Sequence, residues 1–534
     1  MILVRDIRLP LSAGEPQAFE KALHLARVPR AKVGHLGVAK LSVDARHGQP
    51  KLVYTVAVTL KDEGEESAYA GASPCVALHQ KVDFSVQNGT RPLAHRPVVC
   101  GLGPAGLFAA LLLARQGYRP IVLERGPALD ERVKAVEHFS ATGELDENAN
   151  IQFGEGGAGT FSDGKLTTGI KDRRCSWVTE QLVEFGAPPE ALYLAKPHIG
   201  TDMLRGVVRR IRERIVELGG EVRFSSRLSD LIIKDGALHA VRVSSAEGEY
   251  ELGCEALILA CGHSARDTYE MLKARNVAMK QKPFSIGARI EHRQSMINVA
   301  QYGRAGADPA TLKILGAAEY KLSRQLKSGR GVYTFCMCPG GQVVCSSSEE
   351  GMVATNGMSL HARDGENANS ALLVSVNPGD FGSDDVLAGV EFQRRYERAA
   401  FFAGGGDYRA PAQRVEDFLK NRASRRFGDV TPSYMPGVRP ANLSAALPEF
   451  AFESMREALP QLGRLLRGFD HPDAVLTGVE TRSSAPVRIE RGADGCANIG
   501  GLYPTGEGAG WAGGIMSAAV DGIRQAQRIL GINE

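Results

Sequence analysis

A glycine-rich turn between two short apolar segments restricts the fold of this chain more than any other feature. Residues 97–100 predict a buried strand, residues 107–114 predict a buried helix, and Gly101-Leu102-Gly103-Pro104-Ala105-Gly106 lies between them. The chain then turns and enters a second apolar strand, residues 121–123, which ends in Glu124. These segments form a βαβ unit with an acidic residue at the end of its second strand.

Each glycine of this turn has a separate role in binding a dinucleotide. Gly101 permits the tight turn, Gly103 lets the backbone approach a pyrophosphate, and Gly106 lets the helix lie close to the strand. The N–H groups at the positive end of the helix face the phosphates, and Glu124 is placed to accept hydrogen bonds from a ribose. The motif therefore predicts dinucleotide binding, in preference to a plain glycine turn.

The composition indicates a globular protein of several domains. The chain has 534 residues, 43% hydrophobic and 23% charged, which predicts roughly three domains. A net charge of +3 argues against a dedicated nucleic-acid-binding surface, and the apolar runs are too short to span a bilayer. The first ten residues carry Arg5, Asp6 and Arg8 and do not resemble a signal peptide. With nine scattered cysteines, we expect free thiols and a cytoplasmic location.

Residues 1–90 form a small domain of their own in this interpretation. The expected order is βαββαβ, typical of a ferredoxin-like fold, with strands at 2–9, 39–44, 51–60 and 81–86 and helices at 16–27 and 67–75. A basic cluster around Lys40 and Arg46 fits a solvated face better than a nucleic-acid contact. Residues 87–97 predict a linker.

A second glycine-rich segment, residues 152–166, is the next candidate for a ligand contact. Its glycine density lets backbone approach a flat ligand closely, and Ser162, Asp163 and Lys165 add polar groups that can reach the edge of a ring. A flexible surface loop is the alternative. Beside a dinucleotide fold, we favour a cofactor contact.

The middle of the chain predicts the rest of the nucleotide domain and then a substrate-side domain. Helices are expected at 128–139, 201–218, 383–403 and 449–468, strands at 221–224, 257–262 and 284–291, and hairpins joining 228–234 to 238–244 and 331–337 to 342–347. The second hairpin turns at Pro339-Gly340-Gly341. No second strand–G-x-G-x-x-G–helix unit occurs there, so an independent NAD(P) domain is not expected.

The segment of residues 499–516 carries a third glycine-rich pattern and leads into a long helix at 517–530. Glu507 stands where a carboxylate can bind a sugar-alcohol chain. The N–H groups at Gly513 and Gly514, which open the helix, face a group that becomes negative on reduction. This pattern is more specific than the first glycine turn alone.

With these motifs the chain resembles the FAD-dependent oxidoreductases that have a glutathione-reductase-type flavin domain. The first glycine turn with Glu124, the strand that ends at Gly262, and Gly506-Glu507-Gly508 before a helix carry the resemblance. Such enzymes usually have Asp where this chain has Glu507. The whole chain is more closely similar to a bacterial group of uncharacterised FAD-dependent dehydrogenases, through residues 154–165, 335–341 and 503–510. The resemblance implies FAD and names no substrate.

Few side chains stand out as catalytic candidates, because a flavin performs the redox chemistry itself. The candidates are Lys165 near the flavin ring, His263 as a proton donor, and Arg482 as a partner for a substrate carboxylate or phosphate. For Arg482 a structural salt bridge is an equal alternative. Cys336 and Cys338 form C-x-C, which we interpret as structural rather than redox-active, because residues i and i+2 of a strand share a face. No metal site is expected.

We therefore expect a mixed α/β and α+β fold: a Rossmann-like FAD-binding domain at 91–275 and 481–534, an inserted substrate domain at 276–480, and a ferredoxin-like domain at 1–90. The expected cofactor contacts are Gly101, Gly103, Pro104, Ala105, Gly106, Glu124, Arg125, Gly157, Ser162, Asp163, Gly164, Lys165, Gly262, Gly506, Glu507, Gly513, Gly514 and Ile515.

The expected function is an FAD-dependent oxidoreductase that acts on a small organic substrate, with NAD(P)H as a transient reductant. Nucleic acid and membrane insertion are not expected. The alternatives are a flavin-dependent RNA-modifying enzyme and a non-catalytic flavin-binding redox sensor.

Overall fold

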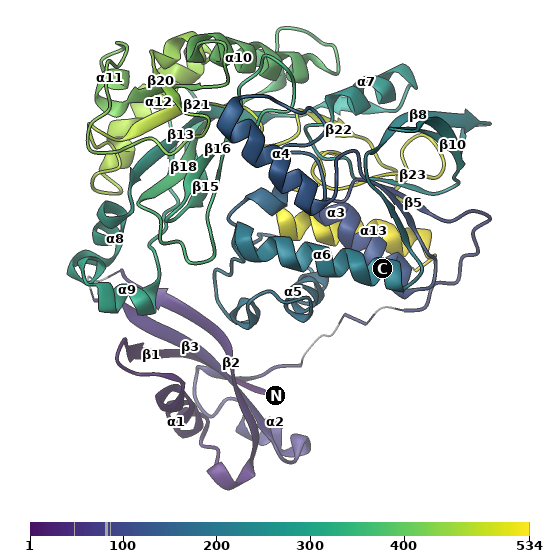
Figure 1. Cartoon of the computed structure of the whole chain (residues 1–534). Coiled ribbons are helices and arrows are strands. Elements are labelled where there is room, and N and C mark those ends of the chain that lie inside the picture. Colours follow the sequence, from purple (N-terminus) through teal and green to yellow (C-terminus); the bar gives the residue numbers. More distant parts are fainter. Residues whose placement is uncertain (47–48, 81–83, 86, 533–534) are drawn as a thin grey trace.

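The computed structural model describes residues 1–46, 49–80, 84–85 and 87–532. Figure 1 shows a small N-terminal unit below a larger body, in which one layered region contains helices α3, α6 and α13 and the other contains strands β13, β15 and β18.

The N-terminal unit is a four-stranded antiparallel sheet of order β2-β3-β1-β4 covered by helix α1. Its elements are β1 (Ile2–Pro10), α1 (Glu15–Ala26), β2 (Val33–Asp44), β3 (Lys51–Leu60), α2 (Glu66–Tyr69) and β4 (Val76–Leu78). The element order is the predicted one, but the last strand among the described residues of this unit is β4, at Val76–Leu78. The strand that we expected at 81–86 falls largely on residues 81–83 and 86, outside the described part of the chain.

The edge strand β2 connects this unit to the body. The backbone N–H of Leu41 donates to the carbonyl of Tyr193, and the N–H of Ala195 donates to the carbonyl of Leu41, both at 2.8 Å. The edge of the sheet is therefore covered in part by the body.

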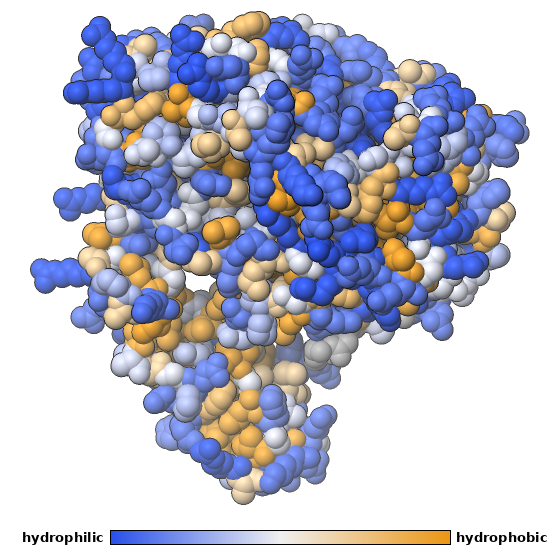
Figure 2. Space-filling model, viewed as in Figure 1, coloured by the Kyte–Doolittle hydropathy of each residue, from blue (hydrophilic) through white to orange (hydrophobic). Residues whose placement is uncertain are grey.

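The surfaces of the two parts differ in character. Figure 2 shows that apolar residues gather on the face of the N-terminal unit turned toward the viewer, whereas the surface over α4 and α6 is mainly hydrophilic.

A five-stranded parallel sheet of order β23-β11-β5-β6-β7 holds the glycine turn. Each strand has three residues: β5 (Val98–Cys100), β6 (Ile121–Leu123), β7 (Glu221–Arg223), β11 (Leu257–Leu259) and β23 (Leu502–Pro504). Four of these strands have all three residues buried, as a parallel sheet covered on both faces requires.

Alternate residues of these strands contribute to two different apolar cores. Val99, Val122 and Ile258 belong to the core with helices α3 (Pro104–Arg115), α5 (Arg174–Glu184), α6 (Thr201–Glu217) and α13 (Ile515–Ile529). Val98, Ile121 and Leu257 face the other core, with the antiparallel sheet β8 (Ser226–Lys234), β9 (Ala237–Ser245) and β10 (Gly248–Gly253). The predicted hairpin 228–234 with 238–244 is present, and β10 adds a third strand that we did not predict.

The second half of the body is built on a seven-stranded sheet of order β14-β15-β18-β13-β21-β19-β20. Its strands are β13 (Phe284–Arg293), β14 (Ser323–Gln325), β15 (Gly331–Cys338), β18 (Asn367–Val376), β19 (Ala410–Arg414), β20 (Val438–Pro440) and β21 (Val475–Glu480). One face is apolar, with Ile286 and Val374 packed in one core with residues of helix α12 (Glu449–Gly463). By strand alternation, the other face carries polar residues such as Ser285 and Arg289.

The predicted hairpin of 331–337 with 342–347 is wrong. Strand β15 pairs with β14 on one edge and β18 on the other, so neither edge is free for residues 342–347. Strand β16 (Gln342–Cys345) pairs instead with β17 (Thr355–Met358). A Cβ on Gly357 would lie 2.3 Å from Oδ1 of Asn369 and 2.7 Å from Nη1 of Arg289, so β17 lies directly over the polar face.

The remaining elements connect and cover these layers. They are α4 (Leu129–Thr142), α7 (Arg266–Ala274), β12 (Met279–Gln281), α8 (Gln294–Tyr302), α9 (Pro309–Leu315), α10 (Ala388–Gly404), α11 (Val415–Leu419) and β22 (Val487–Ile489). Strands β12 and β22 pair with each other where the two halves of the body meet. Within the described residues, none of the helices has the length and apolar character needed to cross a bilayer.

Candidate functional site

The glycine turn after β5 has the close contacts that only glycine allows. Gly101 has φ of +98°, and a Cβ there would lie 2.4 Å from the carbonyl oxygen of Ala260 on the neighbouring strand. A Cβ on Gly106 would lie 1.8 Å from the carbonyl oxygen of Gly101. The first turn of α3, with Pro104 and Ala105, is therefore held tightly against β5, as the sequence predicts.

In contrast, the space in front of Gly103 is open. A Cβ on Gly103 would meet only the Cα of Gly157, at 3.8 Å. Gly157 has φ of +60°, and its own Cβ would lie 2.8 Å from the Cα of Gly103. The first and second glycine-rich segments thus place their backbones against each other and form a cradle at the N-terminus of α3, suited to a phosphate group.

Glu124 lies at the end of β6 and is buried beside this cradle. Its Oε2 accepts a hydrogen bond from the N–H of Leu102 at 2.8 Å, and its Oε1 accepts from Gly126 at 3.0 Å and Gly154 at 2.9 Å. A carboxylate offers about four lone-pair positions, so room remains for a ribose hydroxyl. The adjacent Arg125 donates to Asp267 at 2.9 Å and stacks 4.3 Å above the ring of Phe153.

The polar residues of the second glycine segment bind mainly to protein. Ser162 donates to the carbonyl of Gly159 at 2.7 Å and accepts from the N–H of Gly164 at 3.1 Å, so it stabilises its own turn. Asp163 is buried between Lys165, at 2.7 Å, and Arg363, at 2.9 Å. Burial acts to raise the pKa of Asp163, but Lys165 and Arg363 outweigh it and lower this pKa to about 2.

Lys165 connects the two halves of the body. Its Nζ donates to Asp163 and to the carbonyl oxygen of Met337 in β15. Burial acts to lower the pKa of Lys165, but Asp163 more than compensates and this pKa is raised. Lys165 is therefore a cation at neutral pH, held beside the polar face of the seven-stranded sheet.

The third glycine segment folds back beside the first. A Cβ on Gly506 would lie 2.8 Å from Cβ of Ala105, and a Cβ on Gly508 would lie 2.4 Å from the carbonyl oxygen of Gly262. Helix α13 packs so closely on α3 that a Cβ on Gly522 would lie 2.0 Å from the carbonyl oxygen of Ala105. The structure thus brings together three predicted segments that are far apart in the sequence.

Beyond this close packing, the backbone at the start of α13 faces open space. No protein atom lies within 4 Å of a Cβ position on Gly513, Gly514 or Gly262. Gly514 precedes the first helical residue, Ile515, so the positive end of the helix points into this space. The N–H of Gly513 donates to Oγ of Ser517 at 3.0 Å, and the N–H of Gly514 bonds to the Glu507 carboxyl. Burial raises the pKa of the nearby Glu507 carboxyl to about 7.

The other two catalytic candidates, His263 and Arg482, lie beside a buried ion-pair cluster. Burial, followed by the charges of Arg482 and Arg266, lowers the pKa of His263 to about 3, so the imidazole is neutral at pH 7. Arg482 is buried and donates to Glu397 at 2.9 Å and Ser264 at 3.1 Å. Arg266 shares the same Glu397 at 2.7 Å. These contacts favour the structural salt bridge for Arg482 over contact with a substrate.

Lys282 is a functional candidate that the sequence reasoning missed. Its Nζ donates to Oγ of Ser484 at 2.6 Å. Burial, with the charge of Arg488, lowers the pKa of Lys282, and Glu507 partly opposes this. The surrounding sequence, Lys280-Gln281-Lys282, is typical of a solvated turn and carries no signal that separates Lys282 from its neighbours.

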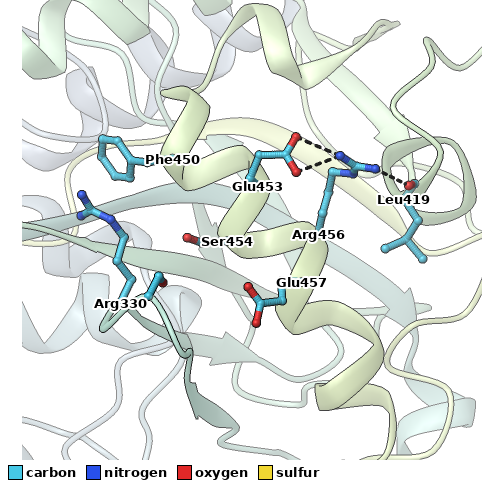
Figure 3. Close-up of a pocket in the computed structure, with 8 residues that line it drawn as sticks. Arg330, Leu419, Phe450, Glu453, Ser454, Arg456 and Glu457 are labelled. Carbon is cyan, nitrogen blue, oxygen red and sulfur yellow. Dashed lines mark hydrogen bonds and ion pairs between the residues drawn. The ribbon is translucent and has the colours of Figure 1, made fainter.

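Two pockets differ in their relation to this site. The smaller, of about 280 Å³, lies at the polar face of the seven-stranded sheet and is lined by Pro283, Phe284, Ser285, Tyr333, Phe335, Ser375, Val376, Asn377, Ser483 and Ser484. Lys282 donates to Ser484 of this lining, and its charge and that of Glu507 influence each other. The larger, of about 510 Å³, lies by α12, where Glu453 and Arg456 pair with each other and Arg330 stacks on Phe450 (Figure 3). It includes no residue of the glycine segments.

The described residues contain no group of three or more His, Cys, Asp or Glu side chains arranged to hold a metal ion.

Comparison with known proteins identifies relatives over the whole chain. Residues 283–483 match the family model of a FAD-dependent protein, C-terminal domain-like, and residues 1–59 match a domain of unknown function (DUF8436). An uncharacterised protein of Clostridium beijerinckii is 48% identical over 532 residues, which cover 99% of this chain and 98% of that protein.

Solved structures match at much lower identity. The flavin-dependent brominase Bmp2 is 12% identical with a TM-score of 0.37, over 82% of this chain and 79% of its own. The glycerol-3-phosphate dehydrogenase from Bacillus halodurans, complexed with FAD, is 12% identical with a TM-score of 0.35, over 83% of this chain and 66% of its own.

Proposed function

We propose that this chain, which belongs to the same family as the Clostridium beijerinckii protein, is an FAD-dependent oxidoreductase that moves a hydride between a small organic substrate and the flavin N5 of FAD. The observation that carries the proposal is the meeting of three glycine segments around one open backbone surface. Gly103, Gly262 and Gly513 each leave room for a ligand, while Gly101 and Gly106 are closed by neighbouring backbone.

The donors and acceptors on this surface fit the parts of FAD in order. The cradle of Gly103 and Gly157 suits the pyrophosphate, and Glu124 retains acceptor capacity for the adenosine ribose. Glu507 stands beside Gly262 and suits the ribityl hydroxyls. When bound, FAD supplies the two-electron chemistry, and the protein supplies position and electrostatics.

The residues around the open surface determine which charges are tolerated there. The positive end of helix α13 at Gly514 favours negative charge. Glu507, with its pKa raised to about 7, holds a proton on its carboxyl below neutral pH. Lys282 donates to Ser484, which lines the smaller pocket, so its Nζ lies beside the space that we assign to the substrate. We assign this pocket to the substrate, and expect an anionic or carbonyl-bearing compound.

NAD(P)H docks transiently in this proposal. We assign the βαβ unit that contains Gly101, Gly103 and Gly106 to FAD, and residues 275–480 carry no second strand–G-x-G-x-x-G–helix unit. The electron donor therefore shares the substrate pocket or approaches the flavin from the surface, and we place the reaction in the cytoplasm.

The proposal is tested with Gly103→Trp in the full-length protein. Because a Cβ at Gly103 meets nothing closer than 3.8 Å, a side chain can begin there without a backbone clash, and the bulk of an indole would then occupy the cradle. We expect a folded protein with unchanged circular dichroism and no bound FAD, whereas Gly379→Trp, at an exposed glycine with equal space, keeps its FAD. A folded Gly103→Trp protein with normal flavin absorbance would overturn the assignment.

Anaerobic titration of the wild-type protein separates the proposed dehydrogenase from its alternatives. Bleaching of the flavin by NADH or NADPH supports the dehydrogenase. Co-purification of RNA with salt-dependent affinity supports the RNA-modifying enzyme. Negligible turnover with every reductant supports the redox sensor.

A further inference from the structure

The Cys336-Met337-Cys338 segment does not follow regular strand geometry. In β15, Phe335 pairs with Ala371 and Cys338 with Asn369, so one extra residue is accommodated between them. Cys336 has φ of +43°, in the left-handed region that non-glycine residues seldom adopt. The segment is thus a β-bulge, and the expectation that both cysteines point to one face of a regular strand is wrong.

A buried cation, Arg289, and a half-buried cation, Lys165, hold the bulge in place. Arg289 donates from Nη1 to the carbonyl oxygen of Cys336 at 2.8 Å, and Lys165 donates from Nζ to the carbonyl oxygen of Met337. Both cations have fixed partners, since Arg289 pairs with Glu480 at 2.5 Å and Lys165 with Asp163 at 2.7 Å. The cations therefore come from two different halves of the body and meet at this one segment.

The two thiols differ in access. Cys336 is half-buried, whereas Cys338 is fully buried and donates from Sγ to the carbonyl oxygen of Cys336 at 3.3 Å. Phe335, the residue before the pair, is exposed and lines the 280 Å³ pocket. A half-buried thiol beside a fully buried one, next in the chain to a residue that lines a pocket, is the arrangement of an attacking and a resolving cysteine.

The electrostatic surroundings favour the thiolate of Cys336. A hydrogen bond from Cys338, followed by the charges of Arg289 and Lys165, lowers the pKa of the Cys336 thiol, whereas the pKa of Cys338 is raised. By contrast, burial raises the pKa of Cys175, another half-buried cysteine. The titratable and charged groups facing Cys336 are Cys338, Arg289, Lys165, Asp163 and Glu507, with Glu480 behind Arg289.

We propose that Cys336 and Cys338 are a dithiol–disulfide couple, in which Cys336 attacks the sulfur of a small-molecule disulfide at the pocket and Cys338 resolves the product. The S–S bond of the external disulfide breaks, one thiolate leaves and takes a proton from water, and a mixed disulfide forms on Cys336. Cys338 then loses its proton and attacks Sγ of Cys336, which releases the second thiol. Two electrons pass from the cysteine pair to the external disulfide, which becomes two thiols.

This inference rests on the proposed function in one respect: we assign reduced FAD as the electron donor to the cysteine pair in the cell. The exchange itself requires only a thiol reductant such as dithiothreitol. The two proposals therefore fail separately: a Gly103→Trp protein that has lost FAD keeps the thiol exchange.

The first test is alkylation of full-length protein by iodoacetamide across a pH series, followed by peptide mass spectrometry. At about pH 6 we expect Cys336 to react at least about tenfold faster than Cys175, because only the thiolate reacts. Lys165→Met should shift the Cys336 profile toward higher pH and leave the Cys175 profile unchanged. Equal profiles for the two cysteines in the wild-type protein would refute the proposal.

The second test treats the reduced protein with oxidised glutathione. We expect the peptide that contains both cysteines to lose the mass of two hydrogen atoms, while Cys338→Ser accumulates a glutathione adduct on Cys336 and Cys336→Ser forms neither product. The peptide also contains Cys345, so Cys345→Ser, which should behave as wild type, is the control. A glutathione adduct that persists on wild-type Cys336 without the mass loss would show that Cys338 does not resolve it and would overturn the couple.

Discussion

The parallel and the antiparallel sheets present their functional groups in different ways. In the parallel sheet, β5, β11 and β23 are short strands that lead into glycine turns, and the surface offered to a ligand is open backbone at Gly103, Gly262 and Gly513. In the antiparallel sheet, long strands carry side chains such as Arg289 and Glu480 on a buried polar face, fixed by ion pairs. The first surface depends on the absence of side chains, and the second depends on their pairing.

The difference predicts opposite responses to mutation. A surface made of glycine backbone is disrupted when side-chain atoms are added. Where neighbouring atoms are close to the glycine the added atoms reduce stability, and where the space is open they block a ligand. A buried ion-pair network fails when one charge is removed, because its partner remains buried without compensation. Four variants are expected to separate these responses, with effects that decrease from the first to the last.

The largest effect is expected for Glu397→Leu in the antiparallel half. Glu397 is fully buried and neutralises both Arg266 and Arg482, at 2.7 and 2.9 Å. Its removal leaves the buried Arg482 without a carboxylate and Arg266 with Glu349 alone, and we expect the free energy of unfolding to fall by about 3–5 kcal/mol in urea denaturation. Glu391→Leu, an exposed position on the same helix, should change it by less than about 1 kcal/mol. Equal effects at both positions would contradict the role of the network.

Gly106→Ala should have the next largest effect, in the parallel half. The added Cβ would lie 1.8 Å from the carbonyl oxygen of Gly101, so helix α3 must move away from β5. We expect a loss of about 3 kcal/mol in the free energy of unfolding, together with loss of FAD. Wild-type stability in this variant would show that helix and strand do not pack as described.

Asp163 connects the two halves, and its contribution depends on pH. Its pKa is about 2 in the folded protein against an ordinary 3.8, so it stabilises the fold above pH 3.8, and this stability is lost as pH falls through 2. The shift corresponds to about 2 kcal/mol. Asp163→Asn should therefore be less stable at neutral pH and show a shallower loss of stability in acid, measured by urea denaturation from about pH 2 to pH 6. If the loss of stability between about pH 6 and pH 2 is the same in Asp163→Asn as in the wild type, Asp163 does not stabilise the contact between the two halves.

Gly513→Ala should have the smallest effect on stability. Nothing lies within 4 Å of its Cβ position, so we expect a change below about 0.5 kcal/mol. FAD retention, followed by fluorescence of the released flavin, should nevertheless weaken, because the methyl group enters the surface assigned to the cofactor. If the variant binds FAD as tightly as the wild type does, the flavin does not bind at this end of helix α13.

The sequence predicts the half with the parallel sheet, where backbone forms the site, better than the half with the seven-stranded sheet, where side chains form it. Gly101, Gly103 and Gly106 have local roles that a short motif reveals, and the meeting of Gly262 with Gly508 follows from the expected sheet. The contacts of Arg482 with Glu397 and of Lys282 with Ser484 join segments far apart in the chain, and no local pattern indicates them.

Two errors have the same physical origin. The hairpin around Pro339 was inferred from a local turn pattern, but both edges of β15 are occupied by β14 and β18, which come from other parts of the chain. The C-x-C motif was interpreted as a regular strand, and the bulge that separates Cys336 from Cys338 depends on the distant residues Arg289 and Lys165. In both cases tertiary pairing outweighed local preference.

The position of β23 at the edge of the parallel sheet has a consequence for biosynthesis. Strand β11 pairs with β5 on one side and with β23 on the other. The ribosome synthesises the whole antiparallel half after β11 and before β23, so β11 has no partner on its second edge during that time. At about 5–20 residues per second, that interval lasts tens of seconds. During it the nascent chain exposes an apolar strand edge, which is a template for aggregation. Chaperone dependence in the cell should therefore be governed by the order of synthesis as well as by the stability of the finished protein.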